Sequence, residues 1–426
     1  MKQKVELNSS PELKPGLNLV SAAAISIGAT IGAGIFAVTG IAAGEAGSAL
    51  LLSLILAATC TLLTAISFIE LISWKPAEGS IYYYSRELVS PFIGFLVGWI
   101  WIISTLFTGA TVALSFSHYF RDVIPLSLKS NQIALIIIFL FTILNYIGLE
   151  ESAFVNNLLV LLKILILIAF VVIGFFFIKP ENFRPLSFSP PHIFIAAAII
   201  FFAYGGFARV AIIAEEIKNP RKTVPKAILL SLLISTVIYF LVTFVALGLA
   251  GAVRLSHSGA PLSTAIRQTG LKWTGLAVGL GGVLATASVL LTSILGVSRM
   301  GLAMSRQRDL PAAFQSIHPK FHTPAAGVVA TGLVMALLAY FFDLSKVVSI
   351  SSFSLLAYYS MANISALRLK NWSRSYPVII SWAGLIFCLA IGFFLLFSQP
   401  STLVISLICL LIGTILYLFR KKSANF

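Results

Sequence analysis

Charged side chains are scarce in this sequence. Asp, Glu, Lys and Arg make up only 10% of its 426 residues, whereas a soluble domain carries about 25%. No segment alternates apolar and polar residues, which excludes a transmembrane β-barrel. The chain has three cysteines, Cys60, Cys388 and Cys409, all inside apolar runs. It therefore has neither a disulfide framework nor the cysteine spacing of a metal site.

The apolar runs also lack the groups that catalysis requires. They contain no nucleophile–base pair, no cluster of metal ligands and no cofactor motif, so we expect neither an enzyme nor a cofactor. The formal net charge is +15, but most lysines and arginines fall in connections on one side of the predicted membrane segments. That bias predicts a plasma-membrane topology with both termini in the cytoplasm, and not a nucleic-acid partner.

Long apolar runs dominate what remains. A helix of about 20 apolar residues spans a bilayer, and the sequence contains roughly twelve such runs. The predicted fold is an all-α integral membrane protein surrounded by membrane lipids. The predicted spans are 17–41, 47–72, 91–119, 131–149, 155–178, 191–215, 226–251, 274–304, 324–341, 346–368, 376–397 and 401–419.

Glycines crowd the middle of the first predicted span, in the stretch GATIGAGIF at 28–36. Each glycine costs a helix about 1 kcal/mol relative to alanine. A phosphate loop is excluded because it needs a preceding strand. Two explanations remain open: Gly28 and Gly32 let another helix approach closely, or the helix is interrupted there and lines a cavity. Gly205 and Gly206, in the middle of the sixth span, favour interruption, because inverted-repeat transporters carry breaks in both halves.

The positions of the two interruptions predict a function. Breaks in the first and sixth spans have the offset of a five-plus-five inverted repeat with discontinuous helices 1 and 6. Freed amides at the start of a second half-helix suit a carboxylate. Freed carbonyls at the end of a first half-helix suit an ammonium group or a cation. The pattern therefore predicts a site for a zwitterion.

Two basic residues lie inside predicted spans. Lys163 is near the middle of the fifth; its amine either extends to the membrane surface or is buried, where it can exchange protons near neutral pH. Arg209, deep in the sixth span, stays charged and needs a carboxylate or carbonyls around it. We expect Glu70 to be that carboxylate. The pair Glu215 and Glu216 begins a charged connection and is expected to be solvated.

These residues lie in segments that resemble the amino acid–polyamine–organocation superfamily of transporters. SIGATIGAGIFAVTG is similar to its first-helix motif, and KPAEGSIYYYSRELVSPFIGFLVGW to its segment joining the second and third helices. FFAYGGFARVAIIAEEIKNPRKTVPKAI resembles its sixth-helix signature, and SRMGLAMSRQRDLPAAFQSIHPKFHTP the loop after its eighth helix. The resemblance implies the leucine-transporter type of fold, a five-plus-five inverted repeat with two flanking helices.

The resemblance also implies roles for individual residues. Backbone amides around Ala33, Gly34 and Ile35 would bind the substrate carboxylate, and carbonyls around Thr30 and from Phe202 to Gly205 would bind the amino group. Ile31 and Ala203 fall in these two stretches and are expected to bind substrate as well. Apart from the resemblance, the small Gly205 and Gly206 with the aromatic Phe202 and Phe207 suggest room for an apolar side chain of the substrate.

Lys163 matches the position at which some members replace a sodium ion with a lysine. Its ammonium would lie beside the carbonyls of Gly28 and Ile31 and the hydroxyl of Ser288, which implies proton coupling without sodium. One departure concerns the sixth span. Many members have an acid after GGF, but this chain has Ala208 followed by Arg209, so any gate that uses the acid is absent and the role of Arg209 is unexplained.

The sequence thus predicts a secondary amino acid permease, with neutral substrates favoured because no acid is placed to select a cation. An amino acid exchanger and a polyamine or cationic amino acid permease are the alternatives from the same class; a non-transporting sensor or a channel is the alternative from another. Residues 1–16 are expected to form a cytoplasmic tail, 17–370 the transporter core, and 371–426 two accessory spans with a second tail. The sequence predicts no oligomeric state.

Overall fold

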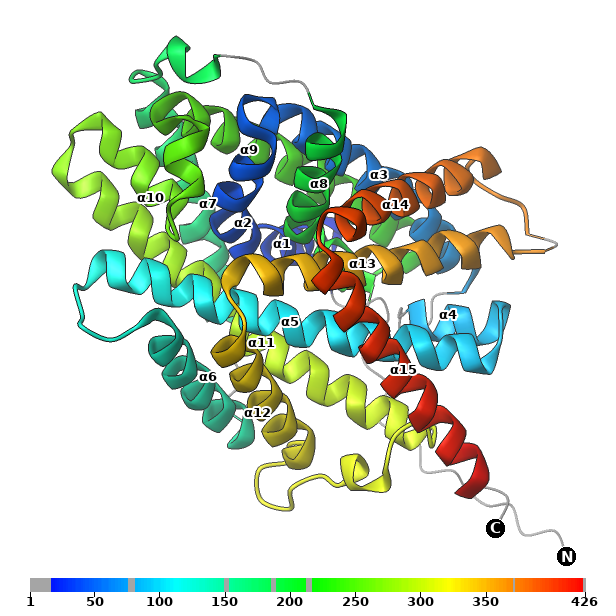
Figure 1. The fold of residues 1–426 in the computed structure, drawn as a ribbon. Helices are drawn as coiled ribbons and strands as arrows, with labels where there is room; N and C mark the ends of the chain where they lie inside the picture. The colour runs from blue at the N-terminus through cyan, green and yellow to red at the C-terminus, as the bar shows by residue number, and fades with distance from the viewer. Residues whose placement is uncertain are drawn as a thin grey trace, which may run out of the picture.

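The computed structural model describes residues 17–75, 81–148, 153–184, 189–211, 217–370 and 372–423. Regular structure within these ranges is helical, apart from one isolated parallel β-bridge between Leu17 and Ile217. Figure 1 shows the helices packed around one another in a single bundle.

The helices follow the predicted spans closely. In chain order they are α1 (Leu19–Thr30), α2 (Ala33–Ala46), α3 (Leu50–Trp74), α4 (Ile81–Leu88), α5 (Pro91–Val123), α6 (Ser130–Tyr146), α7 (Ala153–Phe175), α8 (Pro190–Phe201), α9 (Pro220–Ser256), α10 (Pro261–Ile266), α11 (Lys272–Arg306), α12 (Ala325–Phe341), α13 (Leu344–Leu367), α14 (Val378–Ser398) and α15 (Pro400–Ser423).

Within the described ranges, nine helical stretches are long and apolar enough to cross a membrane, and the first, Leu19–Trp74, includes two predicted spans. The shorter apolar helices α6 and α12 coincide with the predicted fourth and ninth spans. The predicted all-α membrane fold is therefore confirmed. The inverted repeat and the division into core and accessory spans stay predictions.

The first and sixth spans lie inside the bundle. The pair α1–α2 packs against α8 and α9, and α3 packs against α8 and α9 as well, while the long helix α5 packs against α11 and α13. The apolar stretches containing α8 and α13 are 72% buried, whereas that of α15 is only 17% buried. The last helix is thus peripheral, and the glycine-rich segments are enclosed.

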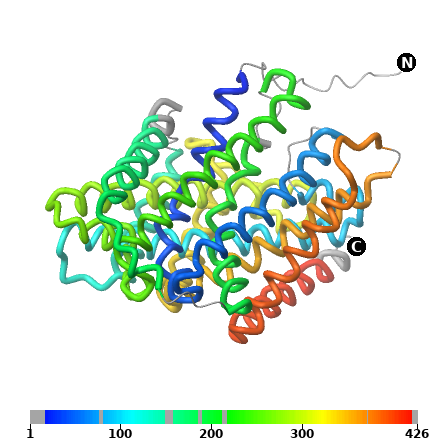
Figure 2. Tube along the Cα trace, turned by 90° about the horizontal axis from the view of Figure 1, so that it is seen from above, coloured from blue at the N-terminus to red at the C-terminus, as the bar shows by residue number. Residues whose placement is uncertain are grey.

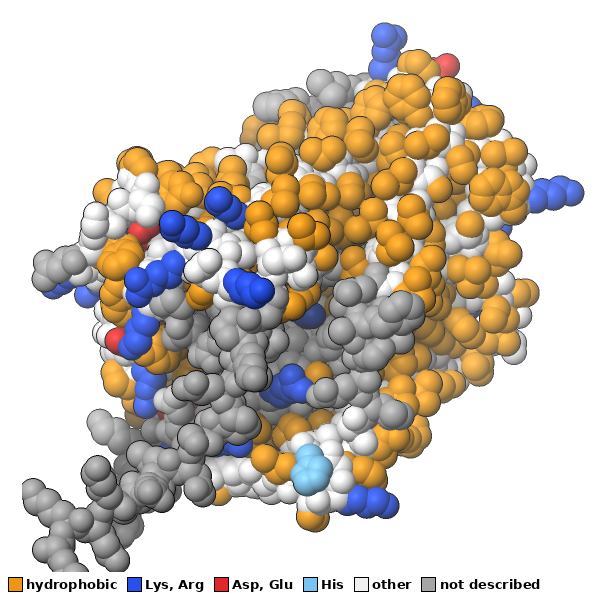
Figure 3. Space-filling view, turned by 180° about the vertical axis from the view of Figure 1, so that it is seen from behind, with side chains coloured by type: hydrophobic (Ala, Val, Ile, Leu, Met, Phe, Trp, Pro, Cys, Tyr) orange, Lys and Arg blue, Asp and Glu red, His pale blue; other side chains and the backbone are white. Residues whose placement is uncertain are grey.

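Large apolar side chains cover much of the outer surface. Figure 3 shows a broad apolar area over one face, with most of the visible Lys and Arg side chains toward its lower left. On α14 the exposed side chains include Trp382, Ile386 and Leu389, each more than half exposed. An apolar surface of this extent requires lipid around it.

The start of α1 is joined to the segment that precedes α9. Besides the β-bridge, the backbone N–H of Lys218 donates to the carbonyl of Leu17 at 2.9 Å. The side chain of Asn18 accepts from the N–H of Ser21 at 3.0 Å and so caps α1. Figure 2 shows α1 and the beginning of α9 projecting on the same side of the molecule.

A partly buried ion pair holds α4 to the loop after α11. The guanidinium of Arg86 donates to Asp309 Oδ2 at 2.8 Å, and the Asp309 side chain is fully buried. Burial raises the pKa of Tyr82, whose hydroxyl therefore stays protonated and donates to the same oxygen at 2.5 Å. These contacts connect two segments more than two hundred residues apart in the sequence.

Replacing Arg86 with alanine should lower the free energy of unfolding by about 3 kcal/mol, because it removes the guanidinium that donates to the fully buried Asp309 carboxylate. Thermal unfolding of the purified protein measures the loss. The matched control is Lys75→Ala, which breaks the solvent-exposed ion pair with Glu87 and should leave stability near the wild-type value. Equal stability of the two variants would contradict the structural role of Asp309.

Candidate functional site

The first span is interrupted where the glycines predict. Helix α1 ends at Thr30, and Ile31 (φ −77°, ψ 70°) and Gly32 (φ −112°, ψ −142°) leave the helical region before α2 begins at Ala33. A side chain at Gly32 is blocked, since its Cβ would lie 2.7 Å from Val289 of α11. The first predicted interruption is confirmed.

The sixth span is also interrupted. Helix α8 ends at Phe201 and is followed by the short 3₁₀ turn η3 (Phe202–Tyr204), by Gly205 and Gly206, and by a second 3₁₀ turn, η4 (Phe207–Ala211). The 3₁₀ turns shift the backbone hydrogen bonding and so end the regular α-helix. The second predicted interruption is confirmed as well.

The two interruptions touch each other through glycine. A Cβ on Gly34 would lie 2.4 Å from the Cα of Ala203, and a Cβ on Gly206 would lie 2.0 Å from the carbonyl oxygen of Ala29. The other explanation for the first-span glycines also holds at one position, because a Cβ on Gly28 would lie 2.4 Å from Val160 of α7. Glycine therefore serves both interruption and close packing in this span.

Buried backbone amides begin the second half of the first span. Ala33, Gly34 and Ile35 are all buried, and no side chain caps α2 at its N-cap residue, Gly32. The first N–H groups of a helix have no partner inside that helix. This end of α2 is thus an electropositive patch of backbone of the kind that binds a carboxylate.

A tyrosine hydroxyl lies against the carbonyl groups of both breaks. Tyr239, fully buried on α9, donates to the carbonyl of Thr30 at 2.6 Å and to that of Ala203 at 3.0 Å. These are two of the carbonyls assigned to the substrate amino group by resemblance. Tyr359 of α13 similarly donates to the carbonyl of Gly205 at 3.1 Å. The sequence reasoning missed both residues, although a tyrosine inside an apolar span usually needs a hydroxyl partner.

Removing the Tyr239 hydroxyl should weaken the contact between the breaks. We expect Tyr239→Phe to lower the free energy of unfolding by about 1–3 kcal/mol, because the buried carbonyls of Thr30 and Ala203 lose a donor. The control is Tyr340→Phe, at a position 56% exposed. Thermal unfolding measures both, and a Tyr239→Phe variant as stable as its control would show that the bridge contributes nothing.

The two aromatic side chains expected to leave room for an apolar substrate group are packed. Phe207 is fully buried, stacked on Tyr359 with ring centroids 4.9 Å apart and edge-on to Phe68 at 6.4 Å. Phe202 is 8% exposed. The structure thus encloses both rings, and their part in substrate binding stays a prediction.

Lys163 is buried at 2% exposure and turned into the protein. Its Nζ donates to the hydroxyl of Ser288 on α11 at 2.9 Å, so the alternative in which the amine reaches the membrane surface is wrong. The close approach of Gly28 to Val160 places the end of α1 beside α7, one turn from Lys163. The role of this contact in proton coupling, together with the carbonyls of Gly28 and Ile31, stays a prediction.

The predicted partner of Arg209 is wrong. Its guanidinium donates to the hydroxyl of Thr292 at 3.1 Å, one turn along α11 from Ser288. Glu70 instead accepts three hydrogen bonds from the segment before α14, from the indole N–H of Trp372 and from the backbone N–H groups of Ser375 and Tyr376. The error arose because both side chains are charged and deep, which does not determine the direction in which each points. Glu215 and Glu216 lie outside the described residues.

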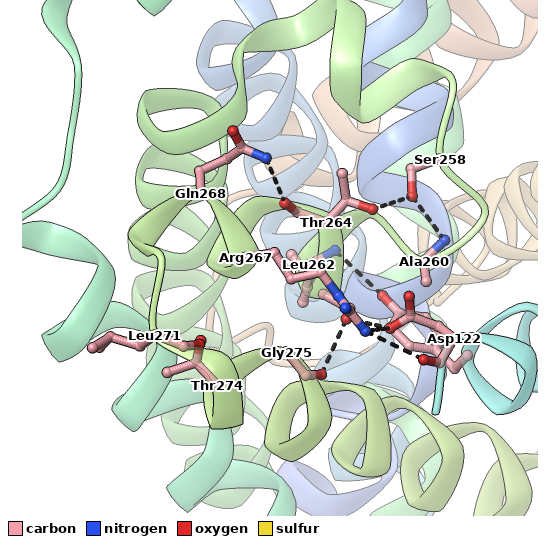
Figure 4. A network of polar contacts seen from close by, with 12 residues as sticks. Asp122, Ser258, Ala260, Leu262, Thr264, Arg267, Gln268, Leu271, Thr274 and Gly275 are labelled. Carbon is pink, nitrogen blue, oxygen red and sulfur yellow. Dashed lines mark hydrogen bonds and ion pairs between the residues drawn. The ribbon is translucent and has the colours of Figure 1, made fainter. Parts of the chain in front are cut away.

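A polar network holds the short helix α10 against the end of α5 (Figure 4). Arg267 donates to Asp122 Oδ2 at 3.1 Å and to its carbonyl at 3.2 Å. The Ser263 hydroxyl donates to the same carboxylate and contacts the carbonyl of Gly275 at 3.1 Å. Helix α10 is therefore attached to both α5 and the start of α11.

The same network reaches toward the first break. The N–H of Leu262 donates to the hydroxyl of Tyr119 at 3.4 Å, and that hydroxyl donates to the carbonyl of Phe36 on α2 at 3.0 Å. Beside the network lies an open cleft of about 410 Å³, lined by residues that include His118, Arg121 and His257. The cleft is at the end of α5 and not at the breaks.

Two interrupted helices that face one another inside a membrane-spanning bundle define a membrane transport protein. The chain belongs to the amino acid permease family, which it matches over residues 17–418. It is 36% identical over 391 residues to an uncharacterised transporter of Mycobacterium tuberculosis, covering 91% of this chain and 88% of the relative.

Two relatives from Bacillus subtilis have named substrates. A branched-chain amino acid permease is 31% identical over 444 residues, covering 97% of this chain and 94% of the relative. A methylthioribose transporter is 31% identical over 445 residues, covering 98% of this chain and 96% of the relative. Family membership thus establishes a permease, while its relatives differ in what they carry.

Proposed function

We propose that this permease is a secondary transporter of neutral α-amino acids in the plasma membrane, working by alternating access with both termini in the cytoplasm. The contact of the two helix breaks carries the proposal. It brings the uncapped amides of Ala33, Gly34 and Ile35 close to the carbonyls of Thr30 and Ala203. A carboxylate and an ammonium group need complementary partners of this kind.

The tyrosine bridge supports a binding step in which hydrogen bonds are exchanged. An ammonium group has three donors and no acceptor, so it can take the carbonyls of Thr30 and Ala203 that now accept from Tyr239. The exchange would loosen the contact of α9 with both breaks. Binding would then favour a different arrangement of the half-helices, as alternating access requires.

Preference for neutral amino acids rests on the side chains near the breaks. Among the described residues, Glu70 is the buried acid of the neighbouring helix α3, and its carboxylate is fully engaged by the segment before α14. Within the described ranges, Glu70 is therefore not available to balance a cationic substrate in a low-dielectric site. The branched-chain relative supports the same preference.

Proton coupling without sodium rests on Lys163. Its amine is enclosed and bonded to Ser288, beside the end of α1. A protonated amine there would stabilise the carbonyl-rich end of that half-helix, and loss of the proton would release it. Accumulation of the substrate would in this way be driven by the proton gradient.

A thermal-shift screen of the purified protein against the twenty amino acids, putrescine and methylthioribose tests the proposal. A neutral amino acid should raise the melting temperature, since a ligand that binds the folded state stabilises it. That ligand should then enter proteoliposomes saturably when a pH gradient is imposed, without sodium. Stabilisation by putrescine or methylthioribose alone would overturn the carboxylate site. Uptake that requires amino acid inside the proteoliposomes would indicate an exchanger. An ohmic current would indicate a channel.

A further inference from the structure

Helices α3 and α14 are joined by polar contacts that the permease function does not use. The hydroxyl of Ser67 donates to that of Ser381 at 2.9 Å, and the Sγ atoms of Cys60 and Cys388 lie 3.5 Å apart. Cys60 and Ser67 are two turns apart on α3, as are Cys388 and Ser381 on α14, so the two helices run antiparallel in a constant register. Both thiols are buried, at 0% and 1% exposure.

Several donors surround the sulfur of Cys388. The amide nitrogen of Asn363 donates to the hydroxyl of Thr64 at 3.1 Å and to the carbonyl of Tyr359 at 3.2 Å, and it lies 3.9 Å from Cys388 Sγ. Because the Thr64 oxygen accepts that bond, its own hydrogen is available for Cys388 Sγ, 3.5 Å away. The Cys60 thiol, 3.5 Å away, can supply a further hydrogen. Donors of this kind stabilise a sulfur that carries negative charge, which makes Cys388 the better nucleophile of the pair.

The amide of Asn363 offers one more feature. Its Oδ1 atom is buried and has no hydrogen-bond partner among the described residues. An unpaired buried acceptor is costly. The oxygen belongs to the side chain whose amide nitrogen lies 3.9 Å from Cys388 Sγ, so an acceptor without a partner adjoins the pair of thiols.

We propose that Cys60 and Cys388 form a peroxide-sensitive dithiol that arrests transport when it is oxidised. Cys388 attacks hydrogen peroxide, the O–O bond breaks, and Cys388 sulfenic acid and water form. The Cys60 thiol then attacks the sulfenic sulfur, which creates the disulfide and releases a second water. The two thiols are oxidised and one peroxide is reduced, and the sulfurs must approach from 3.5 Å to about 2.05 Å.

The position of the bond gives it an effect on transport, an inference that rests on the proposed function. Helix α3 packs against α8 and η4, and its Phe68 contacts Phe207 beside the second break. On the other side, α14 faces lipid with Trp382, Ile386 and Leu389. A disulfide would therefore fix α3, which adjoins the site, to α14, which packs against α8 and α13 with its other face toward lipid. Alternating access requires elements around the site to move.

Hydrogen peroxide treatment of the protein in proteoliposomes tests the proposal. Peptide mass spectrometry should find a Cys60–Cys388 disulfide that a reductant reverses, and amino acid uptake should fall with its formation and return on reduction. The matched control is Cys409→Ser, which removes the third cysteine, on α15, and should behave as wild type. Cys60→Ser should retain uptake under peroxide and accumulate a sulfenic acid at Cys388 that dimedone labels.

Two results would overturn the proposal. One is that Cys60 and Cys388 both remain free thiols, counted after denaturation, under conditions that oxidise Cys409. The other is a complete disulfide that leaves uptake unchanged. Absence of uptake before any oxidation would instead count against the proposed function, and the disulfide would still be measurable in the same sample.

Discussion

Replacing Lys163 with methionine should abolish substrate accumulation driven by a pH gradient. Methionine keeps most of the length and apolar contact of the side chain but removes the amine that donates to Ser288. The variant lacks the group that, in the proposed mechanism, gains and loses the proton beside α1. Uptake down a substrate gradient should persist, because the helix breaks themselves are unchanged. Radiolabelled uptake into proteoliposomes with and without a pH gradient measures both.

Lys179→Met is the matched control, since Lys179 follows α7 and its side chain is exposed. It removes the same charge without touching the interior, and pH-driven accumulation should remain. A Ser288→Ala variant removes only the hydroxyl acceptor and should weaken the coupling less than loss of the amine. Retention of full pH-driven accumulation in Lys163→Met would exclude this lysine from coupling and leave it a structural role.

Replacing Gly34 with leucine should abolish substrate binding, and Gly34→Ala should weaken it by about tenfold or more, equivalent to at least about 1.4 kcal/mol. A Cβ at this position would meet the Cα of Ala203 at 2.4 Å, so the half-helices must separate even for alanine. Separation moves the amides at the start of α2 away from the carbonyl of Ala203. Ligand-induced thermal stabilisation measures the affinity.

Gly392→Ala provides the comparison. This glycine is also buried in an apolar helix, α14, but its added Cβ would lie at an ordinary 3.7 Å from Phe353. Any general effect of replacing a membrane glycine on substrate affinity appears in both alanine variants. The difference in affinity between Gly34→Ala and Gly392→Ala therefore reports the contact between the breaks. Unchanged affinity in Gly34→Leu would contradict the carboxylate site.

Local composition marked the positions of the breaks, and the second glycine pair favoured interruption over close packing as their explanation. Glycine weakens a helix through its own backbone freedom, so GATIGAGIF and Gly205-Gly206 mark their positions without knowledge of any neighbour. The helix bounds could also be predicted locally, because the length of each apolar run sets the length of its span. The contact between Lys163 and Ser288 came from the resemblance, and the structure contains it.

Contacts between distant helices could not be predicted in this way. The pairing of Tyr239 with Thr30 and Ala203, of Arg209 with Thr292, and of Glu70 with the segment before α14 depends on how each helix is rotated about its axis. In an apolar span that is buried on several sides, the sequence pattern does not determine that rotation. The assignment of Glu70 to Arg209 failed for this reason.

The backbone seam between Leu17 and the segment at Ile217 and Lys218 has a mechanical consequence. It joins the start of the first interrupted span to the segment that follows the second. Neither of these two span ends can therefore move outward without the other. If the proposed alternating access opens the protein on that side, this short stretch of main-chain pairing must break for both spans together. A disulfide between cysteines introduced at Leu17 and Ile217 would then lock this side of the protein closed. The opposite side would stay free to open.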